Sequence, residues 1–196
     1  NSMLELVAFA VAAGCLLGLS SLMVVSLLAP ERRLWPAGGD DRKRRVYLAL
    51  SRPLLPAVFA TGVLDRNAGP LAAPWHLAVG AVGVLAAFAV LSRSAADLGE
   101  DATEGREDEL RTDGLYRYTR NPQNVGYALL FATYAVLANS PLVGVLTVEF
   151  AAVTVLQVLA EEAWLRDTYG DAYDAYCERV PRFVGVQTFT RALDDD

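Results

Sequence analysis

Apolar residues are concentrated in long stretches of this chain, and the charged residues lie between them. Three stretches contain no Asp, Glu, Lys or Arg at all: residues 6–29, 67–92 and 121–148. Each approaches or exceeds the roughly 20 residues that an α-helix needs to cross a bilayer. The pattern therefore predicts an all-α, multi-pass membrane helix bundle.

Charged and turn-forming residues divide the apolar stretches into about five transmembrane helices. We expect them at 6–29, 46–64, 74–91, 123–138 and 141–160. The second is the least apolar because it contains Arg52, Pro53 and Pro56, which predict a kinked helix whose arginine faces protein or extends to the interface. Only Asn139 and Ser140 separate the last two helices, so these two form an antiparallel hairpin.

The basic residues predict an orientation in the cell membrane. Five spans with the N-terminus outside place all of the 17 Lys and Arg residues except Arg52 and Arg66 on the cytoplasmic side, as the positive-inside rule requires. We expect a single integral-membrane domain over 1–196, with a three-span part at 1–91 and a second part at 92–196.

The segment after residue 160 is predicted to be a cytoplasmic helix, broken at Gly170. Residues that are mostly apolar or aromatic recur in it at helical spacing. The stripe they form consists of Glu162, Leu165, Tyr169, Tyr173, Tyr176 and Val180. This stripe is expected to pack on the bundle or to lie at the membrane surface.

Composition narrows the possible partners. Acidic residues outnumber basic ones 23 to 17, and Lys43 is the sole lysine, which is typical of a salt-adapted organism (a halophile) and argues against nucleic acid as a partner. One histidine and two cysteines are too few for an ordinary zinc site, which needs about four such ligands. We therefore expect no metal.

Two polar groups are predicted to meet at the cytoplasmic end of the hairpin. Arg120 precedes the fourth span, whereas Glu161 and Glu162 follow the fifth, and the two arms have similar lengths. Opposite charges placed together in this way form either a plain salt bridge or part of a ligand site. A further acid, Glu149, lies within the fifth span and either has a function or pairs with Arg52.

The residues around these groups follow a recognisable pattern. The first part reads Gly114-x-Tyr116-x-x-x-Arg120-Asn121-Pro122-Gln123-Asn124-x-Gly126. The second reads Glu161-Glu162-x-x-Leu165-x-x-x-Tyr169-Gly170-x-x-Tyr173-x-x-Tyr176, followed by Val180-Pro181-Arg182. Together they resemble the isoprenylcysteine carboxyl methyltransferase and phospholipid methyltransferase family, in which the pattern is approximately GxYxxxRHPxYxG followed by EExxLxxxFGxxYxxYxxxVPR.

Two positions depart from that pattern, and one upstream pair agrees with it. Leu98-Gly99 matches a Leu-Gly of the family, whereas Asn121 stands where histidine is usual and Asn124 where tyrosine is usual. Asparagine does not titrate near neutral pH, so Asn121 is not expected to transfer a proton.

The resemblance implies an enzyme that transfers a methyl group from S-adenosylmethionine to a lipid or lipidated acceptor at the cytoplasmic face. The acceptor is an isoprenylcysteine-like carboxylate or a phospholipid amine. Catalytic roles are implied for Arg120, Glu161 and Glu162. The implied cofactor-binding residues are Leu98, Gly99, Gly114, Tyr116, Arg120, Asn121, Pro122, Gly126, Glu161, Glu162, Leu165, Tyr169, Tyr173 and Tyr176.

Two other functions stay open on the sequence. One is an NADPH-dependent membrane reductase, because some reductases have a similar C-terminal pattern. The other is a non-catalytic membrane protein that keeps only the scaffold, for which the changes at Asn121 and Asn124 are the best argument.

Overall fold

Helices and loops make up the part of the chain described in the computed structural model, which comprises residues 2–98, 110–188 and 190. The elements are α1 (Ser2–Leu28), η1 (Pro30–Arg32), α2 (Asp41–Leu64), α3 (Trp75–Leu98), η2 (Gly114–Arg117), α5 (Pro122–Ala138), α6 (Pro141–Tyr169) and α7 (Asp171–Arg179). No strand occurs among the described residues. The prediction of an all-α fold is confirmed.

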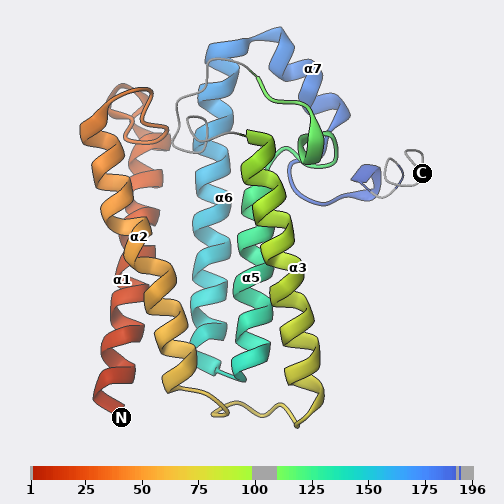
Figure 1. Ribbon diagram of the computed structural model, residues 1–196. Helices are drawn as coiled ribbons and strands as arrows, with labels where there is room; N and C mark the ends of the chain where they lie inside the picture. Colours follow the sequence, from red (N-terminus) through yellow and green to blue (C-terminus); the bar gives the residue numbers. More distant parts are fainter. Residues whose placement is uncertain (1, 99–109, 189, 191–196) are drawn as a thin grey trace.

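The long helices run side by side as a bundle (Figure 1), with α1 and α2 on one side, α5 and α6 in the middle and α3 on the other. Four of them, α1, α2, α3 and α6, are long and apolar enough to cross a membrane. The fifth, α5, has 17 residues, or about 26 Å at the usual helical rise, which is near the lower limit for a span. The predicted membrane helix bundle is therefore confirmed.

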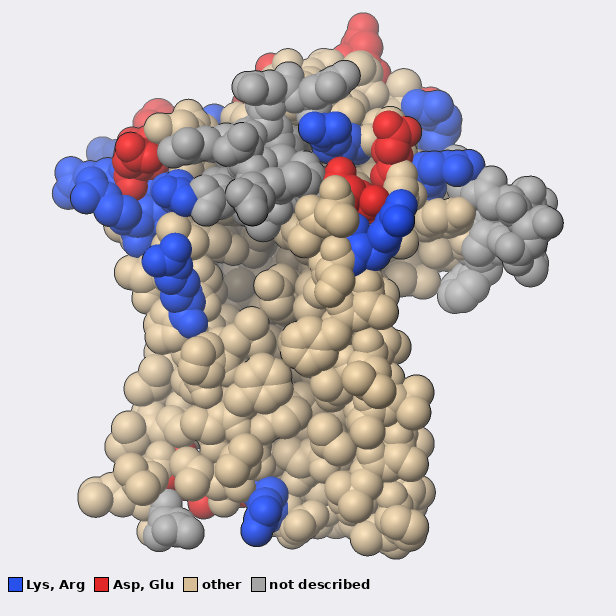
Figure 2. All heavy atoms as spheres, viewed as in Figure 1, with Lys and Arg blue, Asp and Glu red and all other residues tan. Residues whose placement is uncertain are grey.

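Charged side chains gather at the ends of the bundle, and a broad apolar belt separates them (Figure 2). Most lie at one end, which holds residues 29–45, η2 and α7 and is called the charged end below. Large apolar side chains are exposed on the belt, including Leu17, Val82, Leu85 and Val148. Such a surface suits lipid rather than water.

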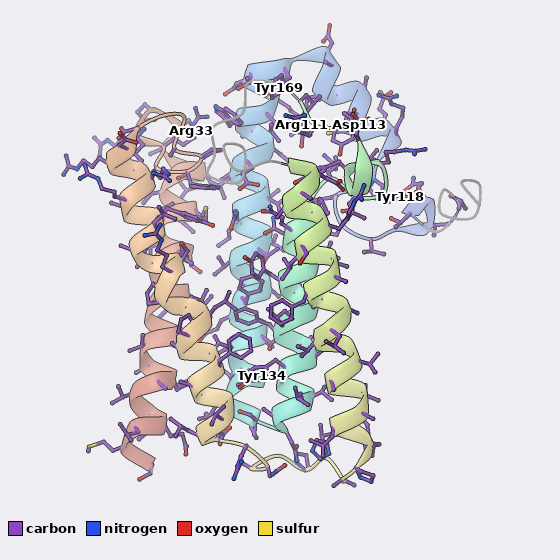
Figure 3. The ribbon with its side chains drawn as sticks, viewed as in Figure 1. Arg33, Arg111, Asp113, Tyr118, Tyr134 and Tyr169 are labelled. Carbon is purple, nitrogen blue, oxygen red and sulfur yellow. The ribbon has the colours of Figure 1, made fainter. Side chains whose placement is uncertain are left out.

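Close contacts hold α3, α5 and α6 together. A Cβ at Gly80 of α3 would clash with Leu137 of α5, so the absence of a side chain lets these two helices approach. Phe131 of α5 stacks on Phe150 of α6 with ring centroids 4.1 Å apart. Tyr134 lies inside the bundle (Figure 3), where its hydroxyl donates a 2.7 Å hydrogen bond to a backbone carbonyl of α2.

The turn between α5 and α6 is tied to the loop between α2 and α3. Asn139 adopts a left-handed conformation (φ 49°), and its side-chain amide donates to the carbonyls of Gly69 and Leu71 at 3.1 Å. The hydroxyl of Ser140 donates to the Asp65 carboxylate at 2.6 Å. The expected antiparallel hairpin is present, and its turn is fixed at the end opposite the charged end.

Three helices extend at least five residues beyond the ends that the apolar pattern predicts. α2 begins at Asp41 because the Asp40 side chain caps it, accepting from the backbone N–H groups of Arg42 and Lys43. α3 extends to Leu98. α6 extends nine residues past the predicted end and breaks at Gly170, as predicted, so Glu161 and Glu162 lie within a continuous helix.

Candidate functional site

A cavity of about 470 Å³ lies between α2, α5 and α6 and reaches the charged end. This volume falls within the range of roughly 300–1,000 Å³ that is common for small-molecule sites. The loop before α2 contributes Trp35 to the wall, and α7 contributes Tyr173 and Tyr176. The surface is visibly hollowed below the charged end (Figure 2).

Arg120 lies at the entrance to α5, where several contacts fix it. Its backbone N–H donates to the carbonyl of Pro181 at 3.0 Å. Its Nη1 lies 2.9 Å from a carboxylate oxygen of Glu162 and 2.7 Å from the sulfur of Cys177. Its Nε is buried and has no hydrogen-bond partner among the described residues. An unpaired donor is therefore left on a side chain that lines the cavity.

Glu162 is the centre of an arginine cluster. Arg182 donates to both of its carboxylate oxygens at 2.8 Å, Arg120 binds one of them, and Nη1 of Arg166 lies 3.9 Å from the other. The glutamate itself is buried. The predicted meeting of Arg120 with the end of α6 is confirmed at Glu162, in the form of a salt bridge.

Glu161 has a different set of partners, all of them neutral. Its Oε1 accepts from the indole N–H of Trp35 at 2.6 Å and from the amide of Gln157 at 2.9 Å. Trp35 is held in turn by Tyr47, with ring centroids 3.9 Å apart, and by its backbone N–H, which donates to the Ser26 hydroxyl. The Oε2 of Glu161 accepts no hydrogen bond from these partners.

Aromatic and apolar side chains form the wall beside the arginine cluster. Tyr116, Leu165, Tyr173 and Tyr176 line the cavity, and the Tyr176 hydroxyl donates to the backbone carbonyl of Tyr116 at 2.7 Å. Burial raises the pKa of Tyr173, with a further upward contribution from the nearby Glu162 carboxylate. Burial likewise raises the pKa of Tyr176. Both phenols are therefore neutral at physiological pH.

Several residues that the resemblance implies for the cofactor do not line the cavity. Gly114 (φ 55°) packs on the Asp97 carboxylate, which also accepts the backbone N–H of Leu115 at 2.8 Å. Gly126 packs against α3, and Pro122 is the buried first residue of α5. These three residues hold η2 and α5 against their neighbours and so place Arg120.

The remaining expected residues divide between the cavity and its surroundings. Asn121 and Asn124 line the cavity, and the Asn121 amide donates to the carbonyl of Arg182 at 2.9 Å. Tyr169 lies at the charged end (Figure 3), outside the cavity lining, in edge contact with Trp164. Leu98 ends α3. Gly99 lies outside the described residues.

The two charged residues at depth are not paired with each other. Arg52 is exposed and lines the cavity. Glu149 is half-buried and is not part of the cavity lining, and its Oε2 has no hydrogen-bond partner among the described residues. No ion pair joins Arg52 to Glu149 in the described part of the chain, so the pairing hypothesis is not supported.

Sequence reasoning did not select Trp35, Tyr47 or Gln157, which surround Glu161. Trp35 is separated from Glu161 by 126 positions in the chain. The available signal was a Trp-Pro pair inside a basic loop, an unusual place for a tryptophan. Nothing in the periodicity of the chain indicates which helix this loop contacts.

Comparison with known protein families gives a match. A family model described as phospholipid methyltransferase matches residues 72–172, just over half of the chain. Arg120, Glu161 and Glu162 lie inside the matched range, whereas Trp35 and Arg52 lie before it. No curated protein and no solved structure matches the chain.

Proposed function

The chain belongs to the phospholipid methyltransferase family, and we propose that it is a membrane methyltransferase that uses S-adenosylmethionine. Its acceptor is a lipid or a lipidated group, and its site faces the cytoplasm. The observation that carries the proposal is the Nε of Arg120, a buried cationic donor without a partner among the described residues, on the wall of a cavity of suitable size.

The residues of the cavity fit the cofactor group by group. Arg120 offers its Nε to the carboxylate, and a charge-assisted bond of this kind is strong in a buried site. Glu161 leaves its Oε2 for a ribose hydroxyl or for the amino group, which are both donors. Tyr116, Leu165 and Tyr176 supply the apolar and aromatic surface that an adenine needs.

When bound, S-adenosylmethionine supplies a methyl group that is already activated by a sulfonium, and S-adenosylhomocysteine remains after transfer. The chain mainly has to orient two reactants and to exclude water. Glu162 holds Arg120 in place, and the tyrosine wall shields the cavity. For an ammonium acceptor, Oε2 of Glu161 takes the proton instead of binding the cofactor, since the partners of this carboxylate are neutral. A carboxylate acceptor needs no such base.

The positive-inside rule supports the orientation. Arg32 and Arg33, at η1, and the basic run from Arg42 to Arg45, in the first turns of α2, lie at the charged end, and Arg44 lines the cavity. Arg66 lies in the loop at the other end. An excess of basic residues marks the cytoplasmic side, so the cavity takes its cofactor from the cytoplasm.

Calorimetric titration of the detergent-solubilised protein with S-adenosylhomocysteine and with NADPH tests the cofactor. We expect S-adenosylhomocysteine to bind and Arg120→Gln to weaken that binding roughly 10- to 100-fold, as expected for a lost hydrogen bond between charged groups. The matched control is Arg179→Gln, on the exposed face of α7. Its affinity for S-adenosylhomocysteine should equal that of the wild type.

Each contrary outcome has a definite meaning. Binding of NADPH alone would identify a reductase, and binding of neither compound would identify a scaffold without this chemistry. The acceptor is found by incubating the protein with native lipid extract and methyl-labelled cofactor, then separating the lipids and peptides that carry the label. Absence of any labelled product would refute methyl transfer to these lipids.

A further inference from the structure

Arg52 occupies an unusual position in α2. It lies 11 residues after the first residue of the helix, or about 16 Å along the axis, in a helix that can cross a membrane. Its side chain is exposed and lines the cavity, and no described residue forms a hydrogen bond or an ion pair with it. A cation at such a depth is costly without a partner, and its partner is often a ligand.

The cavity wall changes character at the level of Arg52. Towards the charged end the lining includes Arg44, Tyr47 and Ser51 of α2. In the other direction the lining is apolar. It consists of Leu54, Leu55, Phe131, Phe150 and Val153. Arg52 therefore stands at the boundary between a polar compartment and one that suits hydrocarbon chains.

The charges of the lining favour an anion at this wall. The cavity is lined by four arginines, Arg44, Arg52, Arg111 and Arg120, and by two acids, Glu161 and Glu162. Glu162 already pairs with Arg120, on the opposite wall from α2. A guanidinium binds a phosphate through two parallel hydrogen bonds, and the adjacent Ser51 hydroxyl can donate a third.

We propose that Arg52 binds the phosphate group of a lipid whose hydrocarbon chains lie in the apolar part of the cavity. The assignment of this lipid as the methyl acceptor rests on the proposed function, whereas the phosphate site itself does not. The family match begins at residue 72, so Arg52 precedes the matched range, whereas the apolar residues Phe131, Phe150 and Val153 lie within it.

The spacing along α2 places the rest of the lipid headgroup near Glu161. Tyr47 stacks on Trp35, which donates to Glu161, and so marks the level of that carboxylate. Arg52 follows Tyr47 by five residues, a rise of about 7.5 Å. Consider a lipid whose phosphate lies at Arg52 and whose chains point away from the charged end. Its headgroup is then directed towards the free Oε2 of Glu161.

Isothermal titration of the full-length protein in detergent micelles tests the site with three probes. These are dihexanoyl phosphatidic acid, dihexanoylglycerol and inorganic phosphate. We expect the wild type to bind phosphatidic acid at least about tenfold more tightly than either of the other probes, because only it combines a phosphate with chains. Equal binding of dihexanoylglycerol would overturn the phosphate contact, and equal binding of inorganic phosphate would overturn the lipid.

The variant Arg52→Gln is expected to weaken binding of phosphatidic acid roughly 10- to 100-fold. Arg52→Lys keeps the charge and should lose less affinity for phosphatidic acid than Arg52→Gln. The matched control is Arg66→Gln, which removes an exposed arginine at the other end of the bundle and should leave the affinity unchanged. An unchanged affinity in Arg52→Gln would refute the proposal.

The same preparations separate this inference from the proposed function. S-adenosylhomocysteine should bind the wild type, Arg52→Gln and Arg66→Gln equally, because Arg52 is not assigned to the cofactor. If neither the wild type nor the variants bind S-adenosylhomocysteine, but the binding of phosphatidic acid still depends on Arg52, the methyltransferase proposal fails and the phosphate site stands. If Arg52→Gln loses both ligands together, the separate lipid site is refuted.

Discussion

The substitution Glu162→Gln removes the negative charge at the centre of the arginine cluster while keeping the shape of the side chain. The amide oxygen can still accept hydrogen bonds, but the amide nitrogen becomes a donor that faces the donors of the surrounding arginines. The cluster would then contain three guanidinium groups and no counter-charge from Glu162. We expect the C-terminal segment, which the Glu162–Arg182 pair ties to α6, to loosen from the bundle.

The size of the effect follows from the burial of each partner. The Glu162 side chain is 3% exposed and that of Arg120 is 10% exposed, with 2.9 Å between the charged atoms. Breaking a buried pair by removing one partner costs about 3–5 kcal/mol. Arg182 is 43% exposed, so water compensates for much of its loss. We therefore expect a destabilisation of about 3 kcal/mol, which lowers the unfolding midpoint by roughly 6–12 °C.

Thermal unfolding in detergent, followed by size-exclusion chromatography of the surviving protein, measures this shift. The control is Glu178→Gln, the same chemical change at an exposed position of α7, for which we expect a change below about 0.5 kcal/mol. If the two variants unfold within 2 °C of each other (about 0.5–1 kcal/mol), the cluster does not hold the C-terminal segment and the reasoning fails. S-adenosylhomocysteine should also bind the Glu162 variant more weakly, since Arg120 is no longer fixed.

Three further predictions concern other parts of the site. Trp35→Phe keeps the ring stack but loses the hydrogen bond to the cavity carboxylate, so methyl transfer should fall about tenfold, whereas Trp75→Phe at the opposite end should leave it unchanged. Gly114→Ala should lower the unfolding midpoint more than Gly170→Ala, because both have positive φ but only the first would clash with a neighbouring side chain. Burial raises the pKa of Tyr176, so the contribution of this tyrosine to stability is present below about pH 10 and is lost at higher pH. The thermal unfolding midpoint of Tyr176→Phe should therefore fall less steeply above pH 10 than that of the wild type.

The bundle was predictable because its signal is local. Uninterrupted apolar stretches and a two-residue connection between α5 and α6 determine the helices and the hairpin without knowledge of any tertiary contact. The ends of the helices were less predictable. The apolar pattern stops at Ala160, and the helical spacing of the residues that follow predicts a helix up to Gly170, but only the structure shows that the two form one continuous helix to Tyr169. The turns after Ala160 pack on α7 and on the arginine cluster, and charged residues with buried partners carry no hydrophobic signal.

The two adjacent carboxylates show which part of a site depends on tertiary structure. Successive residues of a helix point about 100° apart, so Glu161 and Glu162 were bound to meet different partners once α6 reached them, and only one of them faces Arg120. Which of the two carboxylates faces Arg120 depends on the rotation of α6 about its axis. Buried Val158 and Ala160 fix that rotation, and it directs Glu162 to the arginines and Glu161 to Trp35. Three arginines surround Glu162, whereas Glu161 has neutral partners; this difference is why we propose Glu161, rather than Glu162, as the acid that acts on a ligand.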